Sequence, residues 1–248
     1  MVSMFVFPTA DDALSPEPRF GVAVPSTGYY EDEHSRMWIP DVLMSKRNKN
    51  QEIRIVGVPQ TGTPEFYSTV QQESDDFICQ GGVVHYEGIR SCDHYEGDPW
   101  KSKLFLNSLR KVSRTRKITA LNSWDISDTP LQRRVVWENH DVEMCWVVEN
   151  YPDDAMATKT RSWNNLMKNF RNRKLRKDEQ LSFPVPKEIL QFRERRADVV
   201  VTAATESSQP VMMLWNVTAV PDLVESFTRQ GYRIEGVVWK MAQPVNTH

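Results

Sequence analysis

Apolar and polar positions fall into short blocks, and the clearest blocks predict a strand, a helix and a second strand in succession. Residues 53–58 (IRIVGV) are β-branched and almost wholly apolar, as in a strand that is buried on both faces. Thr63 and Pro64 are typical of a helix N-terminus, and residues 83–87 (VVHYE) form the next extended block. A strand, helix and strand in this order predict parallel pairing of the two strands.

Helical and extended patterns also alternate in the second half of the chain. Between residues 159 and 177, Trp163, Leu166, Met167 and Phe170 recur at the spacing of one helix face. We expect helices at 159–177, 187–205 and from Pro221 onward, and strands at 211–215 and 232–242, the last at an edge or in a hairpin.

Residues 1–50 lack this periodicity and contain five prolines. We therefore expect an irregular N-terminal arm over 1–50, with one short strand near 20–24, followed by a single α/β domain over 51–248. The alternation of elements predicts a mixed, mainly parallel sheet with helices on both faces.

Composition narrows the class of protein. Apolar residues make up 40 % of the 248 residues and charged residues 26 %, which is ordinary for a globular protein. No run of about 18 apolar residues occurs, so we expect no membrane partner. The three cysteines form no CxxC pair, which favours a reduced, cytoplasmic protein.

Charge is unevenly placed along the chain. Residues 1–100 hold 7 Lys/Arg and 16 Asp/Glu, whereas residues 101–248 hold 24 Lys/Arg and 17 Asp/Glu. The isoelectric point of about 6.2 is nevertheless far below that of a typical nucleic-acid-binding domain. We therefore expect the negative charge of residues 1–100 and the positive charge of residues 101–248 to balance each other within one domain.

In open parallel sheets, binding sites form beyond the carboxyl ends of the strands. The expected strands place three segments there: residues 59–63, 87–90 and 216–220.

Short motifs at and between these places occur in the order seen in the TraB/TIKI-like superfamily, which is related to erythromycin esterase and ChaN-like proteins. The chain resembles that superfamily over roughly residues 53–242. The matching segments are Gly57-Val58-Pro59-Gln60-Thr61-Gly62, Pro64-Glu65-Phe66-Tyr67, Tyr86-Glu87-Gly88, Asn139-His140-Asp141, Glu194-Arg195, Asn216-Val217-Thr218-Ala219-Val220-Pro221-Asp222 and Gly231-Tyr232-Arg233.

The resemblance implies a metal-assisted hydrolase fold in which two histidines and the glutamate of the Y-E-G turn form the site. Here the histidine positions hold Gln60 and Ala219, and only Glu87 remains. One carboxylate cannot hold a catalytic ion, which usually needs three protein ligands. The resemblance therefore favours a non-catalytic protein without a cofactor.

Such a protein would bind a protein, a peptide or a small ligand in the remnant cleft. The residues assigned to that cleft are Gln60, Glu87, Asn216 and Ala219, with Arg195 as the charge partner of Glu87. Any residual catalytic role would fall to Glu87.

A first alternative is an active metal-dependent hydrolase with a relocated site. His85 and Glu87 alternate along a strand and so share a face, and His94 or His140 would complete the set. Imidazole and carboxylate ligands suit zinc or manganese.

A second alternative is a nucleic-acid-associated protein. Lys168, Arg171 and Lys174 lie close together on the polar side of the helix expected at 159–177, where they could contact phosphates. A solvated helix face explains the same cations, and we favour that interpretation.

Overall fold

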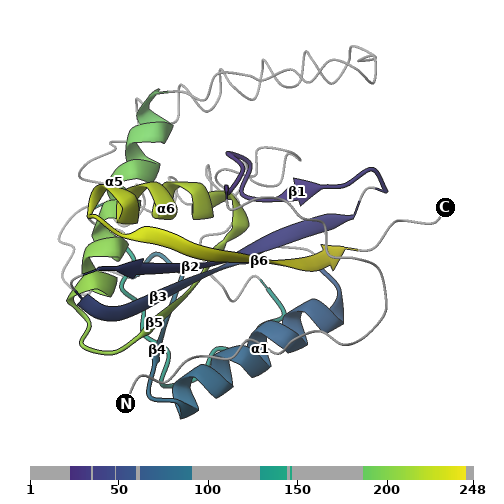
Figure 1. Cartoon of the computed structure of the whole chain (residues 1–248), viewed down its shortest axis with the longest axis horizontal. Coiled ribbons are helices and arrows are strands. Elements are labelled where there is room, and N and C mark those ends of the chain that lie inside the picture. Colours follow the sequence, from purple (N-terminus) through teal and green to yellow (C-terminus); the bar gives the residue numbers. More distant parts are fainter. Residues whose placement is uncertain are drawn as a thin grey trace, which may run out of the picture.

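The structure is a computed structural model, and it describes residues 23–34, 36–47, 49–59, 62–90, 129–143, 146 and 187–243. These residues form one mixed six-stranded sheet with α1 on one face and α5 and α6 on the other (Figure 1). The elements are β1 (Tyr30–Glu31), β2 (Met37–Lys46), β3 (Lys49–Val58), α1 (Pro64–Cys79), β4 (Val83–Tyr86), α5 (Lys187–Glu206), β5 (Val211–Asn216), the 3₁₀ helix η3 (Val217–Ala219), α6 (Val220–Arg229) and β6 (Arg233–Gln243).

Among the named strands of the described residues, parallel pairing involves β3, β4 and β5. β3 and β4 both pair in parallel with β5, which lies between them. The pairings of β2 with β1, β3 and β6 are all antiparallel. The prediction of a mainly parallel sheet is therefore wrong in its proportions. The physical reason is chain connectivity, because only two residues separate β2 from β3 and so short a link joins antiparallel strands.

The second half of the expected N-terminal arm belongs to this sheet. β2 pairs along its length with β6 and, from Asp41 onward, with β3. The prediction of an irregular arm over 1–50 does not hold for residues 37–50, and the expected boundary after residue 50 falls inside β3. Pro40 obscured this strand in the sequence, since proline lacks a backbone donor; here it lies opposite Trp239 of β6, ahead of the pairing with β3. Residues 1–22 lie outside the described residues.

Two apolar layers enclose the sheet. Every residue of β5 is buried; Met212 and Leu214 contact the layer beneath α1, and the alternate residues contact the layer beneath α5 and α6. The α1 layer includes Val56, Phe66, Tyr67, Val70, Phe77, Val84 and Tyr86, and the α5/α6 layer includes Ile53, Ile55, Ala197, Val200, Val201, Leu223 and Phe227. Helices on both faces, as predicted, therefore cover a core made by alternation along the strands.

Local signals predicted the ends of α1 and α6 and the place of β6. The side chain of Thr63 accepts a hydrogen bond from the backbone N–H of Phe66, which confirms the expected start of α1. Gly231 adopts a φ of 87° after α6, a conformation that glycine adopts without strain. β6 runs along the edge of the described sheet beside β2. The helix expected at 159–177 lies outside the described residues.

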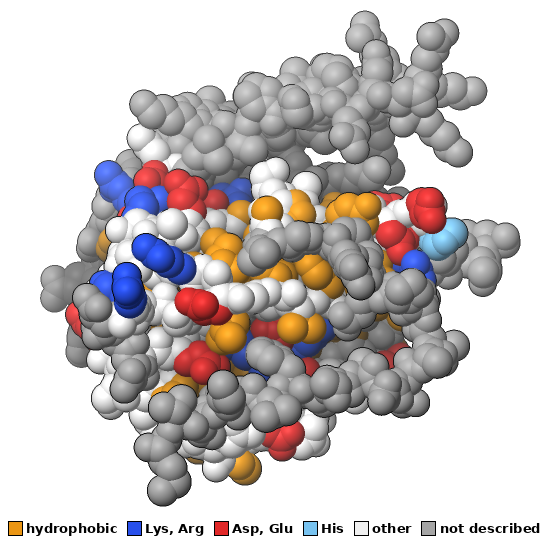
Figure 2. Space-filling model, viewed as in Figure 1, with side chains coloured by type: hydrophobic (Ala, Val, Ile, Leu, Met, Phe, Trp, Pro, Cys, Tyr) orange, Lys and Arg blue, Asp and Glu red, His pale blue; other side chains and the backbone are white. Residues whose placement is uncertain are grey.

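No described helix has the length and apolar character needed to cross a bilayer. Figure 2 shows acidic and basic side chains interspersed on the face in view, with apolar side chains between them.

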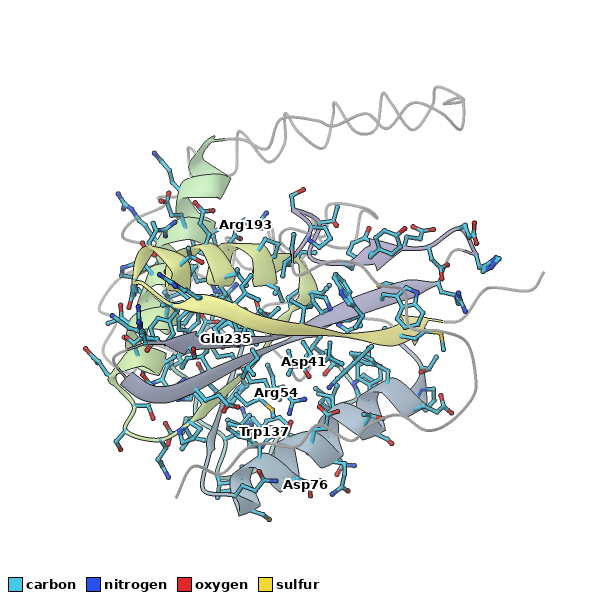
Figure 3. All side chains as sticks on the ribbon, in the orientation of Figure 1. Asp41, Arg54, Asp76, Trp137, Arg193 and Glu235 are labelled. Atoms are coloured by element: carbon cyan, nitrogen blue, oxygen red, sulfur yellow. The ribbon has the colours of Figure 1, made fainter. Side chains whose placement is uncertain are left out.

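A cluster of four charged side chains around buried Asp41 connects β2, β3, α1 and β6 on the α1 face. Asp41, which is 4 % exposed, accepts hydrogen bonds from the guanidinium of Arg54 and lies 2.8 Å from Nζ of Lys240. Both cations also pair with Glu73 of α1. Figure 3 shows Asp41 and Arg54 between the sheet and α1. The four side chains neutralise one another inside the fold.

Candidate metal centre

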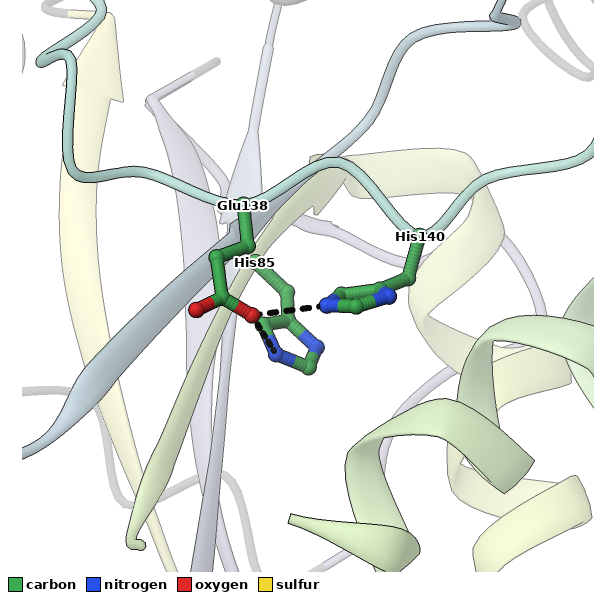
Figure 4. A group of neighbouring side chains, drawn as sticks. All are labelled: His85, Glu138 and His140. Carbon is green, nitrogen blue, oxygen red and sulfur yellow. Dashed lines mark hydrogen bonds and ion pairs between the residues drawn. The ribbon is translucent and has the colours of Figure 1, made fainter.

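Two histidines and a glutamate meet at the end of β4. His85 is the third residue of β4, and it pairs in parallel with Glu138 through an isolated bridge. The backbone N–H of Glu138 donates to Val84 at 2.8 Å, and the N–H of Tyr86 donates to Glu138 at 3.0 Å. This bridge fixes Glu138 beside His85, and His140 follows two residues later on the same loop (Figure 4).

The three side chains lie within direct reach of one another. Oε2 of Glu138 is 2.7 Å from Nε2 of His140 and 3.6 Å from Nε2 of His85. The two imidazole rings lie 4.3 Å apart at an angle of 48°. One ligand atom from each residue can be chosen so that all three lie within 4.8 Å of one another. The set therefore offers two nitrogen donors and one oxygen donor to a single point.

Burial keeps His85 neutral. Its side chain is 2 % exposed, whereas those of His140 and Glu138 are 39 % and 50 % exposed. Burial lowers the pKa of His85 to about 4, and nearby His140 acts in the same direction, against the opposing effect of Glu138. A neutral imidazole has a free lone pair, so His85 is available as a ligand near neutral pH.

The donor set fits a divalent transition metal. Zinc bonds of about 2.0–2.1 Å in a tetrahedral arrangement place neighbouring donors roughly 3.3 Å apart. The observed contacts of 2.7 and 3.6 Å lie on either side of that spacing. Nδ1 of His85 is buried and has no hydrogen-bond partner among the described residues. An unpaired buried polar atom costs about 1–3 kcal/mol, so this ring nitrogen, which is not the one 3.6 Å from Glu138, has an unmet bonding capacity.

A second polar cluster lies beside the first, and Arg196 of α5 is its centre. Nη1 of Arg196 is 2.9 Å from Oε1 of Glu87, and its Nε donates to Oδ1 of Asp141 at 2.8 Å. Its Nη2 pairs with Oδ2 of the same aspartate. The other oxygen of Glu87 accepts the backbone N–H of Asn216 at 2.7 Å. Glu87 and Asp141 are 2 % and 0 % exposed, so a guanidinium holds two buried carboxylates.

Glu87 is therefore committed to protein partners on both of its oxygens. Burial raises the pKa of Glu87 to about 7, even though Arg196 and the amide of Asn216 act in the opposite direction. Among the described residues, the group that could hold an ion together with His85 does not include Glu87. Glu87 comes directly after β4 and is held by Arg196, whereas Glu138 supplies the carboxylate beside His85.

The structure tests only part of the predicted remnant cleft. Glu87 and Asn216 meet, as expected for strands ending at one edge. The side chain of Asn216 turns back to accept the N–H of Thr218, and half-buried Ala219 packs against the apolar layer beneath α5 and α6. Gln60 lies outside the described residues, as do His94, Lys168, Arg171 and Lys174.

The predicted charge partner of Glu87 is wrong by one position. Arg195 is exposed, and Arg196 contacts the carboxylate. One residue turns a helix by about 100°, which separates a buried position from an exposed one. The buried stripe Phe192, Arg196 and Val200, spaced four residues apart, was the sequence signal that could have identified the correct arginine.

Glu138 was also missed as a candidate ligand from the sequence alone. Its position beside His85 comes from the pairing of the chain with β4 and not from any local sequence pattern. The chain turns at residues 135–136 and forms its bridge to β4 at Glu138. The E-x-H spacing of Glu138 and His140 was visible, yet nothing local connects it to His85, which lies 53 residues earlier.

Comparison with protein-family models, curated proteins and solved structures finds no match to this chain. The similarity to the TraB/TIKI-like superfamily stays a prediction from short motifs.

Proposed function

We propose that this protein is a metal-dependent hydrolase whose ion is held by His85, Glu138 and His140. The observation that carries the proposal is the convergence of these three donors around one point at the carboxyl end of β4. Two histidines and one glutamate are the protein ligands of a well-known class of catalytic zinc sites. An ion held there would supply Lewis acidity and an activated water for attack on a carbonyl or phosphoryl group.

Exposure supports an open site rather than a closed structural one. The side chain of His85 is buried, whereas those of Glu138 and His140 are half-exposed to solvent. Three protein ligands leave a fourth position for water or substrate. The position of the cluster at the carboxyl end of β4, which pairs in parallel with β5, also agrees with the usual place of binding sites in such sheets.

A second candidate is the non-catalytic role expected from the missing histidines. Its support is the ion pair of Glu87 with Arg196. The guanidinium of Arg196 supplies a positive charge beside Glu87, the one member of the expected metal-binding set that this chain retains. Under this proposal, the protein acts only by binding a protein, a peptide or a small ligand.

Metal analysis comes first. Protein purified without a histidine tag and stripped with a chelator is titrated with zinc, and bound metal is measured by elemental analysis and calorimetry. We expect one zinc per chain, with affinity reduced about 100-fold in His140→Ala and Glu138→Gln, since each loses one of three ligands. His34→Ala is the matched control, because His34 is 60 % exposed and its described ion-pair partner is its neighbour Glu33.

Hydrolysis is then assayed with ester, phosphoester and peptide substrates. A metal-dependent hydrolase shows activity that a chelator abolishes, that zinc restores and that His140→Ala lacks. Stoichiometric zinc without activity would contradict the enzymatic proposal and support the non-catalytic candidate. Absence of saturable zinc or manganese binding would contradict the metal centre itself.

A further inference from the structure

The loop that supplies two of the three metal ligands is held to β4 by the backbone bridge at Glu138 and, beyond the end of β4, by the side chain of Asp141. Oδ2 of Asp141 accepts the backbone N–H of Gly88 at 3.0 Å, and Oδ1 accepts that of Val142 at 2.8 Å. Asn139 adds a second tie, because its Nδ2 donates to the carbonyl of Gly88 at 2.7 Å and its Oδ1 accepts the N–H of Asp141 at 2.9 Å. Asp141 follows His140 directly, so its position also sets that of the imidazole.

Arg196 connects both sides of this attachment. It contacts Glu87, which lies two positions after His85, and Asp141, which lies one position after His140. Arg196 comes from α5 and lies 55 residues after Asp141 in the sequence. A single guanidinium thus spans the two segments that carry the ligands.

We propose that Arg196 is a positioning residue that sets the position of His140 relative to His85 and Glu138; this inference rests on the proposed metal centre. Its planar guanidinium makes a two-point contact with Asp141 while it also contacts Glu87. Lysine carries the same positive charge but lacks the planar group with several N–H donors. Arg196→Lys therefore still neutralises the two carboxylates, but it cannot make the two-point contact with Asp141. Changes to groups that orient metal ligands typically weaken metal binding about 10–100-fold.

The fold contains a matched control for this chemistry. Arg54 also bridges two carboxylates, Asp41 and Glu73, and it lies on the α1 face of the sheet, away from the candidate metal centre. Arg54→Lys therefore imposes the same chemical change on a buried ion cluster that has no proposed ligand beside it.

The experiment compares Arg196→Lys, Arg54→Lys and the unchanged protein. Zinc affinity is measured by competition with a chelator, and Co²⁺ is substituted because its visible absorption reports the ligand geometry. Thermal unfolding of the metal-free proteins is measured in parallel. We expect Arg196→Lys to weaken zinc binding at least tenfold and to alter the Co²⁺ spectrum, while Arg54→Lys changes neither, even where it lowers the unfolding temperature as much.

A further variant keeps the test possible if Arg196→Lys prevents the protein from folding. Asn139→Ala removes the second tie at a half-buried position, and we expect a several-fold loss of zinc affinity with an altered Co²⁺ spectrum. If both variants fold and bind zinc as the unchanged protein does, the positioning role is wrong. Should Arg196→Lys fail to fold, unchanged zinc affinity in Asn139→Ala overturns the inference. If the unchanged protein binds no metal, the proposed function fails first, which separates the two results.

Discussion

Asp41 is a carboxylate on the strand face that packs against α1. Burial by itself raises the pKa of such a group, but Lys240 and Arg54 outweigh burial and hold the pKa of Asp41 below its usual value of 3.8. A carboxyl group with a lowered pKa stabilises the folded state above its unfolded pKa, and that contribution is lost as the pH falls below it. Asp41 is therefore a specific source of acid sensitivity.

We predict that Asp41→Asn lowers the free energy of unfolding at neutral pH by about 3 kcal/mol, because it leaves two partly buried cations short of a partner. The variant should also lose less stability than the unchanged protein between about pH 4 and pH 2, since the titrating group is gone. Urea unfolding across that range measures both effects. Asp76→Asn at the exposed end of α1 is the control, and equal pH profiles for all three proteins would contradict the assignment.

At the scale of single elements, α1 depends on its first turn. Thr63 is extended, with φ −72° and ψ 153°, and its Oγ1 lies 3.1 Å from the backbone nitrogen of Phe66. Pro64 occupies a position that needs no donor, and Glu65 favours the positive end of the helix dipole. Phe66 and Tyr67 then enter the core within the same turn, so the cap fixes where they pack.

We predict that Thr63→Ala lowers the free energy of unfolding by about 1 kcal/mol, the usual cost of losing an N-cap side chain. Thr63→Ser should restore most of that loss, because serine caps equally well. Denaturant unfolding measures the difference. Ser68→Ala, at an exposed position of the same helix, serves as the control; if it destabilises the protein as much, the effect does not come from the cap.

At the scale of the whole molecule, β2 makes the two halves of the sheet continuous. It joins β6 on one side to β3 on the other, and β3 leads through β5 to β4 and the candidate metal centre. Removing β2 would expose the backbone groups of two strands and open both apolar layers.

We therefore predict that a fragment covering residues 51–248 does not fold cooperatively, although the sequence pattern suggested a domain boundary there. Circular dichroism and urea unfolding of the fragment, compared with the full chain, measure this. A cooperative transition in the fragment with the midpoint of the full chain would show that β2 is dispensable.

Local sequence signals predicted the helices and strands better than they predicted which residues contact one another. Thr63 and Pro64 marked α1, the apolar run at 211–215 marked β5, and Gly231 follows α6 with the positive φ that glycine permits. Each of these depends on neighbours within a few residues. β2 was missed because Pro40 interrupts its pattern, and proline's missing N–H matters only once the pairing partners are known.

The candidate site was less predictable than the fold. His85 and His140 were identified as possible ligands, and the meeting of Glu87 with Asn216 followed from strand order. Arg196 was confused with Arg195, because one helical position decides between core and solvent. Glu138 became a candidate only through a backbone bridge to a residue 53 positions earlier.

The sequence by itself determined the α/β class, the helix termini and the alternation that covers the sheet on both faces, because these follow from backbone preference and burial over short distances. Tertiary structure alone decided which charged groups meet. Inside the fold, an ion pair or a metal ligand must match its partner to within a fraction of an ångström. That precision depends on strand register and helix rotation, which the packing of the whole core sets.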